Sequence, residues 1–308
     1  MPASVLCCVV LALMGAPSQR PSTIAWSPRV PLEGSLVILV VRPPSPAGRG
    51  GQGVRTEDSL VAVQGTLAGE ALHFERASHG FRALGAVPVG AADSVTGSLV
   101  TQHFSGAVDT VVVALRVRRR RVVGERLRVA PEFAQPPDSM SERIRNERTL
   151  LDEVRQRAHG TPRLWGTPFT RPRPGPVTSV FGTPRIFNRA VRSRHYGVDF
   201  AGQLGAPVNA ANRGVVALVA DLYYSGTTVI IDHGGGLLTG YFHLSQVLVA
   251  QGDTVERGQL LGRVGASGRV TRPHLHWFGA YGGITVDPLD LLKLEPSLEW
   301  RAKRKGKG

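Results

Sequence analysis

Short hydrophobic runs, separated by Gly, Pro and Ser, fill the first part of this chain of 308 residues. Short β-branched runs between turn residues are typical of antiparallel strands. The runs are SLVILVV, LVAVQGTL, ALHF, FRALGAVPV, GSLVTQHF and TVVVALRVRRRRVV. Their length and spacing predict an immunoglobulin-like β-sandwich over residues 25–135.

A helical pattern follows at residues 139–160, after the prolines of APEFAQPPDS. Ser139 and Glu142 have the spacing of a capping box, and Gly160 can end a helix. The apolar residues of this segment fall near one helical stripe: Ile144, Leu151, Val154 and Ala158. We therefore predict a short, charged helix that connects two domains.

Strand patterns return after the proline-rich stretch TPFTRPRPGPVTSVFG and continue to about residue 292. Five short runs at Gly-marked turns predict strands, namely residues 214–220, 227–234, 237–245, 259–265 and 274–278. The chain is thus predicted to be mostly β, with a second domain at residues 165–292. Residues 293–308, which end in RAKRKGKG, are expected to form a basic tail.

The first residues form an apolar run, VLCCVVLALMGA at 5–16, that is too short to span a bilayer comfortably. Small residues in APS at 16–18 suit signal peptidase, so residues 1–18 are predicted to be a signal peptide for export across the cytoplasmic membrane. No Lys or Arg precedes the run, so a displaced start or an uncleaved anchor is the alternative. Both cysteines, Cys7 and Cys8, lie in this run, so a metal site in the mature chain must use His, Asp or Glu.

The chain is strongly basic, with 37 Lys and Arg against 23 Asp and Glu and a formal net charge of +14. Such a surface attracts polyanions. The sequence has no basic helical segment with interleaved aromatic residues, which would indicate binding to nucleic acid. Peripheral contact with anionic wall or membrane polymers is therefore favoured. The run RVRRRR at 116–121 fits either such contact or a solvated edge strand whose charges prevent aggregation.

The nine histidines are unevenly distributed. Three of them, His73, His79 and His103, are scattered singly in the first domain and are interpreted as structural. In the second domain, His195 precedes Asp199 by four residues, with Gly197 between them to permit an irregular backbone.

Near the end of that domain, His274 and His276 flank Leu275. Alternate residues of a strand share one face, so both imidazoles are expected to point at a common target. Catalytic zinc takes three protein ligands and keeps one open position, and two His with one Asp satisfy that count. His233 and His243 are the further histidines of this domain.

Three segments resemble the LytM and lysostaphin type of zinc peptidoglycan endopeptidases: RHYGVDFAGQLGAPVNAANRGVV, VIIDHGGGLLTGYFHLSQVLVAQGDTVERGQLLGRVGASGRV and PHLHW. The resemblance covers about residues 165–292. It includes the HxxxD motif, the histidine of YFHLS and the final HxH, in family order. The upstream strands and charged helix also resemble the accessory region of some bacterial members.

This resemblance implies a LytM-type antiparallel β domain with a zinc cleft. It implies that His195, Asp199 and His276 bind Zn²⁺, and that His243 and His274 are catalytic histidines without ligand duty. The implied reaction is hydrolysis of peptide stems and cross-links of peptidoglycan by metal-activated water, with either histidine as the base.

Further features of the resemblance concern residues outside this set. His233 is expected to be structural, and Tyr241 is expected to pack in the core rather than to point toward the site as a hydrogen-bond donor. The family usually has Gly-Pro before the HxH, whereas Arg272-Pro273 stands here. Arg272 could narrow the cleft or attract a substrate carboxylate. Thr227 stands where the family often has asparagine.

Two alternatives to a hydrolase follow from the same residues. One is a catalytically silent, LytM-like wall-binding protein that activates a peptidoglycan amidase, which the intact set of five site residues disfavours. The other is a purely structural metal site, which would need a fourth ligand, and no remaining cysteine or well-placed carboxylate suggests one. The hydrolase interpretation fits three bonds: D-alanyl to diaminopimelate, a glycine bridge, or a non-wall peptide.

Overall fold

The computed structural model describes residues 22–44 and 59–300. The predicted signal peptide and the RAKRKGKG end lie outside these ranges. Within them, the chain forms two compact units that meet at Arg119 and Arg120. No helix in the described residues is long and apolar enough to cross a membrane.

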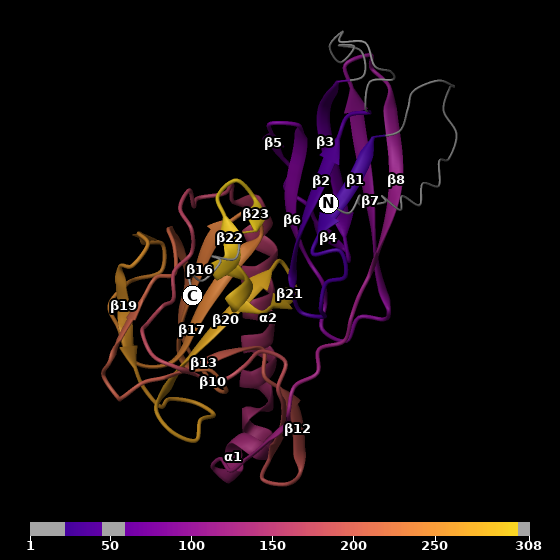
Figure 1. The fold of residues 1–308 in the computed structure, drawn as a ribbon. Coiled ribbons are helices and arrows are strands. Elements are labelled where there is room, and N and C mark those ends of the chain that lie inside the picture. The colour runs from indigo at the N-terminus through magenta and orange to yellow at the C-terminus, as the bar shows by residue number, and fades with distance from the viewer. Residues whose placement is uncertain (1–21, 45–58, 301–308) are drawn as a thin grey trace, which may run out of the picture. The chain divides into compact units, whose positions relative to one another are not determined.

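The first unit consists of two four-stranded sheets, in the orders β1-β2-β6-β5 and β4-β3-β7-β8 (Figure 1). The strands are β1 (Thr23–Ser27), β2 (Leu36–Arg42), β3 (Leu60–Leu67), β4 (Glu70–Ala71), β5 (Glu75–Ala77), β6 (Gly80–Ala86), β7 (Ser94–His103) and β8 (Val108–Arg116). Most of the predicted runs are strands, but ALHF is wrong beyond Ala71, because residues 72–74 have no strand structure.

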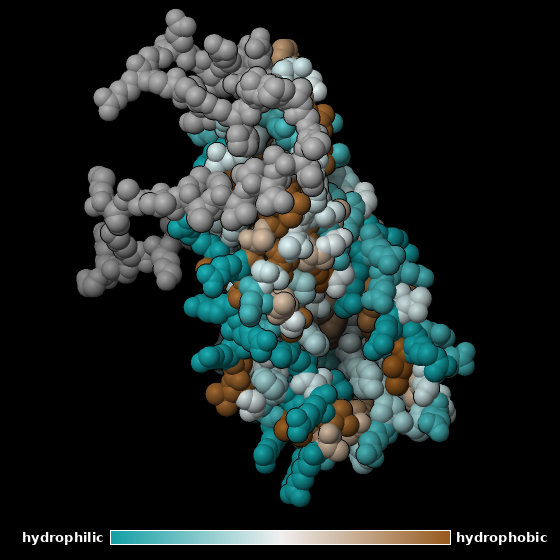
Figure 2. All heavy atoms as spheres, turned by 90° about the vertical axis from the view of Figure 1, so that its right-hand side faces the viewer, coloured by the Kyte–Doolittle hydropathy of each residue, from teal (hydrophilic) through white to brown (hydrophobic). Residues whose placement is uncertain are grey.

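Side chains from both sheets form one hydrophobic core. In β8, Val111, Val113 and Leu115 are buried and their neighbours are exposed, which is the period-2 pattern of a strand with one face inward. This arrangement is consistent with a sandwich, and its immunoglobulin-like type stays a prediction. On the outer face, Val108 and Val112 are exposed, and Figure 2 shows hydrophobic side chains among hydrophilic ones on that side of the molecule.

The run RVRRRR divides between the two units. Only Arg116 belongs to β8, which is an edge strand, so the interpretation of the whole run as a solvated edge strand is wrong. Arg120 instead forms a largely buried ion pair with Asp287 at 2.9 Å.

The second unit is built on a ten-stranded sheet whose main path is β10-β13-β20-β17-β16-β15-β18. Its strands are β10 (Val177–Ser179), β13 (Gly197–Ala201), β14 (Pro207–Asn209), β15 (Gly214–Leu222), β16 (Gly226–Gly234), β17 (Leu237–Val247), β18 (Thr254–Val255), β19 (Leu260–Val264), β20 (His274–Tyr281) and β21 (Ile284–Val286). All five predicted strands are present. The sheet is followed by the short helix η4 (Pro288–Lys293) and by the strand pair β22 (Leu294–Glu295) and β23 (Glu299–Trp300). This strand pair lies inside the predicted tail.

A helix covers one face of this sheet (Figure 1). It is preceded by α1 (Pro131–Ala134) and η2 (Asp138–Met140), spans α2 (Ser141–Arg157) and continues as η3 (Ala158–Gly160). Val154 and Ala158 are buried against Ile230 and Phe278 of the sheet. The predicted capping box is wrong, because the N-cap is Met140 and no side chain caps the helix. The connector helix therefore belongs to the second unit as part of its core.

A small sheet that the hydrophobic pattern did not predict lies beside the main one. It has the order β12-β11-β9, with β12 (Val191–Arg194), β11 (Pro184–Phe187) and β9 (Glu125–Leu127). Strand β9 comes from the segment that follows the first unit and pairs in parallel with β11. This pairing places Glu125 directly opposite Arg185.

Candidate active site

Two neighbouring strands bring the predicted metal ligands together. Strands β13 and β20 are antiparallel, and Asp199 lies directly opposite His276. Side chains in such a register face the same side of the sheet at about 5 Å between Cβ atoms. His195 lies two residues before β13, at the end of the β11–β12 hairpin.

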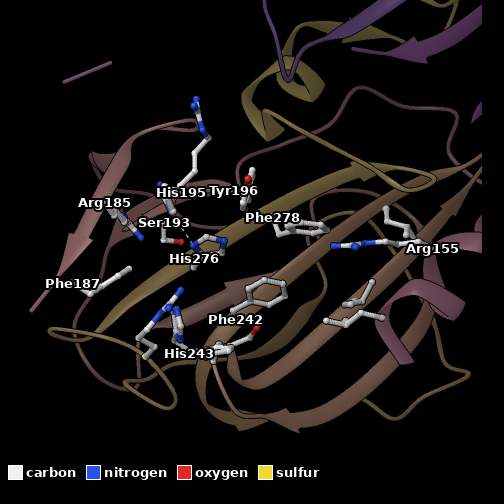
Figure 3. Close-up of a pocket in the computed structure, with 17 residues that line it drawn as sticks. Arg155, Arg185, Phe187, Ser193, His195, Tyr196, Phe242, His243, His276 and Phe278 are labelled. Atoms are coloured by element: carbon white, nitrogen blue, oxygen red, sulfur yellow. Dashed lines mark hydrogen bonds between the residues drawn. The ribbon is translucent and has the colours of Figure 1, made fainter. Parts of the chain in front are cut away.

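The ligand atoms of these three residues all lie within 4.8 Å of one another, and Figure 3 shows the His195 and His276 rings side by side. His195 Nε2 lies 2.9 Å from Asp199 Oδ1 and 2.9 Å from His276 Nδ1. The third side of the triangle, from His276 Nδ1 to Asp199 Oδ1, is 3.0 Å. All three residues are buried.

The chemistry of this triangle fits a zinc ion. His195 Nδ1 faces the carbonyl oxygen of Val180 at 3.0 Å, and because a carbonyl only accepts, Nδ1 carries the proton. The lone pair of Nε2 therefore points at a carboxylate oxygen, which is also an acceptor. A cation between Nε2 and this oxygen would be attracted by both atoms and would remove their repulsion. Zinc bonds of the usual lengths would hold tetrahedral ligand atoms about 3.3 Å apart, close to the separations observed here.

Arg185 holds the second oxygen of the aspartate. Its Nη2 atom donates to Asp199 Oδ2 at 2.6 Å and to Ser179 Oγ at 2.9 Å. Its Nε atom donates to Glu125 Oε2 of β9 at 3.1 Å. Partners of this kind orient metal ligands and tune their affinity. The arrangement leaves Oδ1 for the metal.

Gly197 is needed for a different reason from the one predicted. It lies in strand β13, and its φ is not in the left-handed region that favours glycine. A Cβ atom at this position would lie 2.4 Å from His276 Nε2 and 2.6 Å from the carbonyl oxygen of Trp277. The glycine of HxGxD therefore makes room for the third ligand.

His243 and His274 lie beside the triangle without joining it. Their ring centroids are 5.0 Å apart. His274 Nε2 is 3.6 Å from Asp199 Oδ1, so both histidines of the HxH face the site, as the strand pattern predicted. Each has its Nδ1 on a backbone carbonyl at 2.8 Å, that of Ser267 for His243 and that of Arg272 for His274. Both rings thus keep Nε2 available.

A bulge in β17 aims His243 into the site. The register of β17 against β16 shifts between the pairs Thr227↔Leu244 and Val229↔Tyr241, and His243 has φ 62°. Bulges and left-handed non-glycine residues are common where a strand must redirect a functional side chain. As a result, the consecutive residues Phe242 and His243 line the same cavity.

Burial and neighbouring charges set the protonation of these groups. Burial alone would raise the pKa of Asp199, but positive charge and hydrogen-bond donors on the His195 and His276 rings would hold that pKa well below its usual range, and a cation bound between the three groups would act in the same direction. Burial lowers the pKa of His276 to about 4. Burial also lowers the pKa of His243, and the nearby His274 and His276 lower it further. His276 and His243 are therefore neutral at pH 7, as metal ligation and proton acceptance require.

Two adjoining cavities open onto the cluster, with volumes of about 220 Å³ and 210 Å³. The first is lined by His195 and His276 and has an apolar wall. Phe242 stacks on the His276 ring at 5.2 Å with an interplanar angle of 5°, and Phe278 lies 5.6 Å from Phe242 (Figure 3). Helix α2 contributes Leu151 and Arg155 to this wall. The second cavity reaches Asp199, His243 and His274.

The other predicted positions lie away from the cluster. His233 is buried, with Nδ1 2.7 Å from the carbonyl oxygen of Arg213 and Nε2 2.7 Å from Thr239 Oγ1, which fits the structural role expected of it. Tyr241 is fully buried in the core. His103 is buried beside Asp109 in the first unit, and its Nε2 lies 3.0 Å from Asp109 Oδ2.

Sequence reasoning missed three charged residues of the site: Glu125, Arg185 and Arg269. Arg185 belongs to no motif, and Arg269 lies in a segment of the resemblance without a role assigned to it. Glu125 lies some 70 residues before the HxxxD, and only the parallel pairing of β9 with β11 brings it to the site. No signal in a single sequence marks these positions.

Comparisons with known proteins agree with this geometry. Residues 193–288 match the model of peptidase family M23. Peptidoglycan DD-endopeptidase ShyA of Vibrio cholerae is 47% identical over 102 residues, which are 33% of this chain and 24% of that protein. DD-carboxypeptidase/endopeptidase Mpg of Neisseria meningitidis is 38% identical over 104 residues, or 34% and 24% of the two chains. The match thus spans about a quarter of each relative.

The similarity in fold extends further than the similarity in sequence. A crystal structure from Pseudomonas aeruginosa, assigned to peptidase M23, aligns with a TM-score of 0.61. The alignment covers 85% of this chain and 94% of that one at 23% identity. At this identity the comparison establishes the fold, including a LytM-like β domain.

Proposed function

We propose that this chain, which carries a peptidase family M23 domain of the LytM/lysostaphin type, is a zinc endopeptidase that hydrolyses peptide cross-links of bacterial peptidoglycan. The observation that carries the proposal is the buried triangle of His195, Asp199 and His276 beside two histidines that do not join it. The names of the relatives support the substrate.

The residues divide the chemistry between them. Zinc held by the triangle would supply Lewis acidity and an activated water at neutral pH. His243 and His274 keep Nε2 free toward the site, so either can accept the proton of the attacking water and return a proton to the leaving amine nitrogen. The protonated imidazole also stabilises negative charge that develops on the carbonyl oxygen. Phe242 stacks on the His276 ring and covers one of its faces.

Export is part of the proposal, because peptidoglycan lies outside the cytoplasmic membrane. The apolar run at residues 5–16 and APS at 16–18 support cleavage of a signal peptide close to Ser18. N-terminal sequencing of the exported protein tests this. Recovery of Cys7 and Cys8 in the mature chain would instead support an anchor.

The activity is tested with purified sacculi. The zinc-loaded full chain is incubated with them, and the released muropeptides are analysed by mass spectrometry. We expect new amine and carboxyl termini, their loss with a chelator, and their return with added Zn²⁺. His243→Ala, which leaves the ligand triangle intact, is the matched control for adventitious peptidases.

The silent wall-binding interpretation predicts a different outcome of the same experiment. Wild-type protein would bind sacculi and release no new termini. Addition of a peptidoglycan amidase would then show whether the chain activates that enzyme.

A further inference from the structure

Arg269 lies in an unusual position at the boundary of the two cavities, which it lines together with His243. Its guanidinium carbon is 4.4 Å from the ring centroid of Phe187 and 4.6 Å from that of Tyr224. Two aromatic faces thus hold the planar group in one orientation. Partial burial lowers the pKa of Arg269 from its ordinary value, yet an arginine of this kind stays charged.

Hydrogen bonds to the β15–β16 turn, to β16 and to His243 hold the backbone that carries Arg269. The amide of Arg269 donates to the carbonyl oxygen of Tyr224 at 2.9 Å. Two residues earlier, Ser267 accepts from the Thr227 amide through its Oγ atom and offers its carbonyl oxygen to His243 Nδ1. The loop that orients one catalytic histidine therefore also sets the position of Arg269.

This guanidinium has no acidic partner in residues 22–44 and 59–300. Its ring contacts there are Phe187 and Tyr224, and besides burial the positive charge of nearby Arg185 lowers its pKa. The two carboxylates of the second cavity, Glu125 and Asp199, are both engaged by Arg185. A desolvated cation without a counter-ion is unfavourable unless a ligand supplies the charge.

We propose that Arg269 is a specificity-determining residue that binds a free carboxylate of the substrate, carried by a residue next to the scissile amide. Arginine suits this role because its planar fork donates two parallel hydrogen bonds to a carboxylate. Arg272 lines the same cavity and adds positive charge. The inference rests on the proposed peptidase function and deepens it: the enzyme selects cross-links that bear a carboxylate over neutral bridges.

The test uses two synthetic peptides that differ only in this carboxylate, which is free in one and amidated in the other. The zinc-loaded full chain is compared with Arg269→Gln and with Arg257→Gln. Arg257 is exposed and lines neither cavity, so its variant loses the same charge elsewhere. Zinc content and Tm are measured for each protein. Steady-state kinetics and calorimetric binding of uncleavable analogues are recorded in parallel.

We expect wild-type protein to prefer the free acid by about 10- to 100-fold in kcat/KM and in Kd, the range of a hydrogen bond to a charged group. Arg269→Gln should lose this preference, while the amidated peptide reacts within about threefold of wild type. Arg257→Gln should behave like wild type.

Two results would overturn the inference: wild type binding both peptides equally, or Arg269→Gln weakening both to the same extent. Arg269→Lys provides a folded alternative if the glutamine variant is unstable, and it should retain part of the preference. Because binding is measured separately, a wild-type protein that cleaves neither peptide would count against the proposed hydrolysis, and the binding preference for the free acid would still decide the role of Arg269.

Discussion

The ligand triangle and the histidine pair beside it use the same side chain in two ways. In the triangle, ligand atoms of His195, Asp199 and His276 lie 2.9–3.0 Å apart, and all three residues are buried. In the pair, the rings of His243 and His274 are 5.0 Å apart, and each offers a single nitrogen to the cavity.

The difference lies in what surrounds the imidazoles. His195, His243 and His274 all place Nδ1 on a backbone carbonyl, so their tautomers are the same. The Nε2 of His195 lies 2.9 Å from the Asp199 carboxylate that Arg185 holds, whereas the Nε2 of His274 lies 3.6 Å from the same carboxylate. The role of a histidine here thus depends on the neighbour of its free nitrogen, and removing members of the two groups should have different consequences.

The largest effect is expected in the triangle. His276→Ala and Asp199→Ala each leave two ligands, which rarely hold zinc tightly, so the stoichiometry should fall from about one zinc per chain to near zero. Elemental analysis after gel filtration measures this. Full occupancy in either variant would assign the site to other residues.

The pair should fail in the opposite way. His243→Ala and His274→Ala should keep zinc, since neither side chain is proposed to touch it, and should lose about 10²-fold or more in hydrolysis through the missing proton transfer. Binding to sacculi should persist in both. Loss of metal from His274→Ala would move that residue into the ligand set, a result that its 3.6 Å distance from Asp199 makes worth testing.

Arg185 sharpens the comparison, because it is the group that distinguishes the triangle from the pair. Arg185→Gln should weaken zinc binding by about 10- to 100-fold, the usual cost of losing a partner of a metal ligand. Competition with a chromophoric chelator measures the affinity. Arg257→Gln is the matched control for the loss of charge. If both variants bound zinc with equal affinity, Arg185 would serve only to join β9 and β11.

The two regions also differ in how far the sequence predicts them. The five site residues belong to motifs of the second domain, and the strands that carry His243, His274 and His276 were predicted from their apolar runs. Strand β13, which carries Asp199, was not predicted. Strand β17 was predicted as residues 237–245, yet no pattern shows the bulge that turns His243 inward. Such a bulge depends on pairing with β16, which is a long-range property.

Helix α2 illustrates the same limit at the level of domains. Its stripe of apolar residues correctly predicted a helix, and its charged residues suggested a connector between two domains. Its buried face, with Val154 and Ala158 on the sheet, became evident only from the fold. Likewise, Glu125 and Arg269 reach the site through pairings and loop contacts that local sequence does not encode.

The smallest expected effect concerns the space inside the triangle that Gly197 leaves for the His276 ring. In Gly197→Ala, the added methyl group would meet His276 Nε2 and the backbone of Trp277. Because the backbone cannot yield easily, the His276 ring must shift, so zinc should bind about tenfold more weakly and the free energy of unfolding should fall by about 1–3 kcal/mol. Gly166→Ala is the matched control, since a Cβ atom there meets nothing within 4 Å. Denaturant unfolding and zinc competition on both variants measure the two quantities. If Gly197→Ala matched Gly166→Ala in both, the close packing of His276 on β13 would not be what holds the third ligand in place.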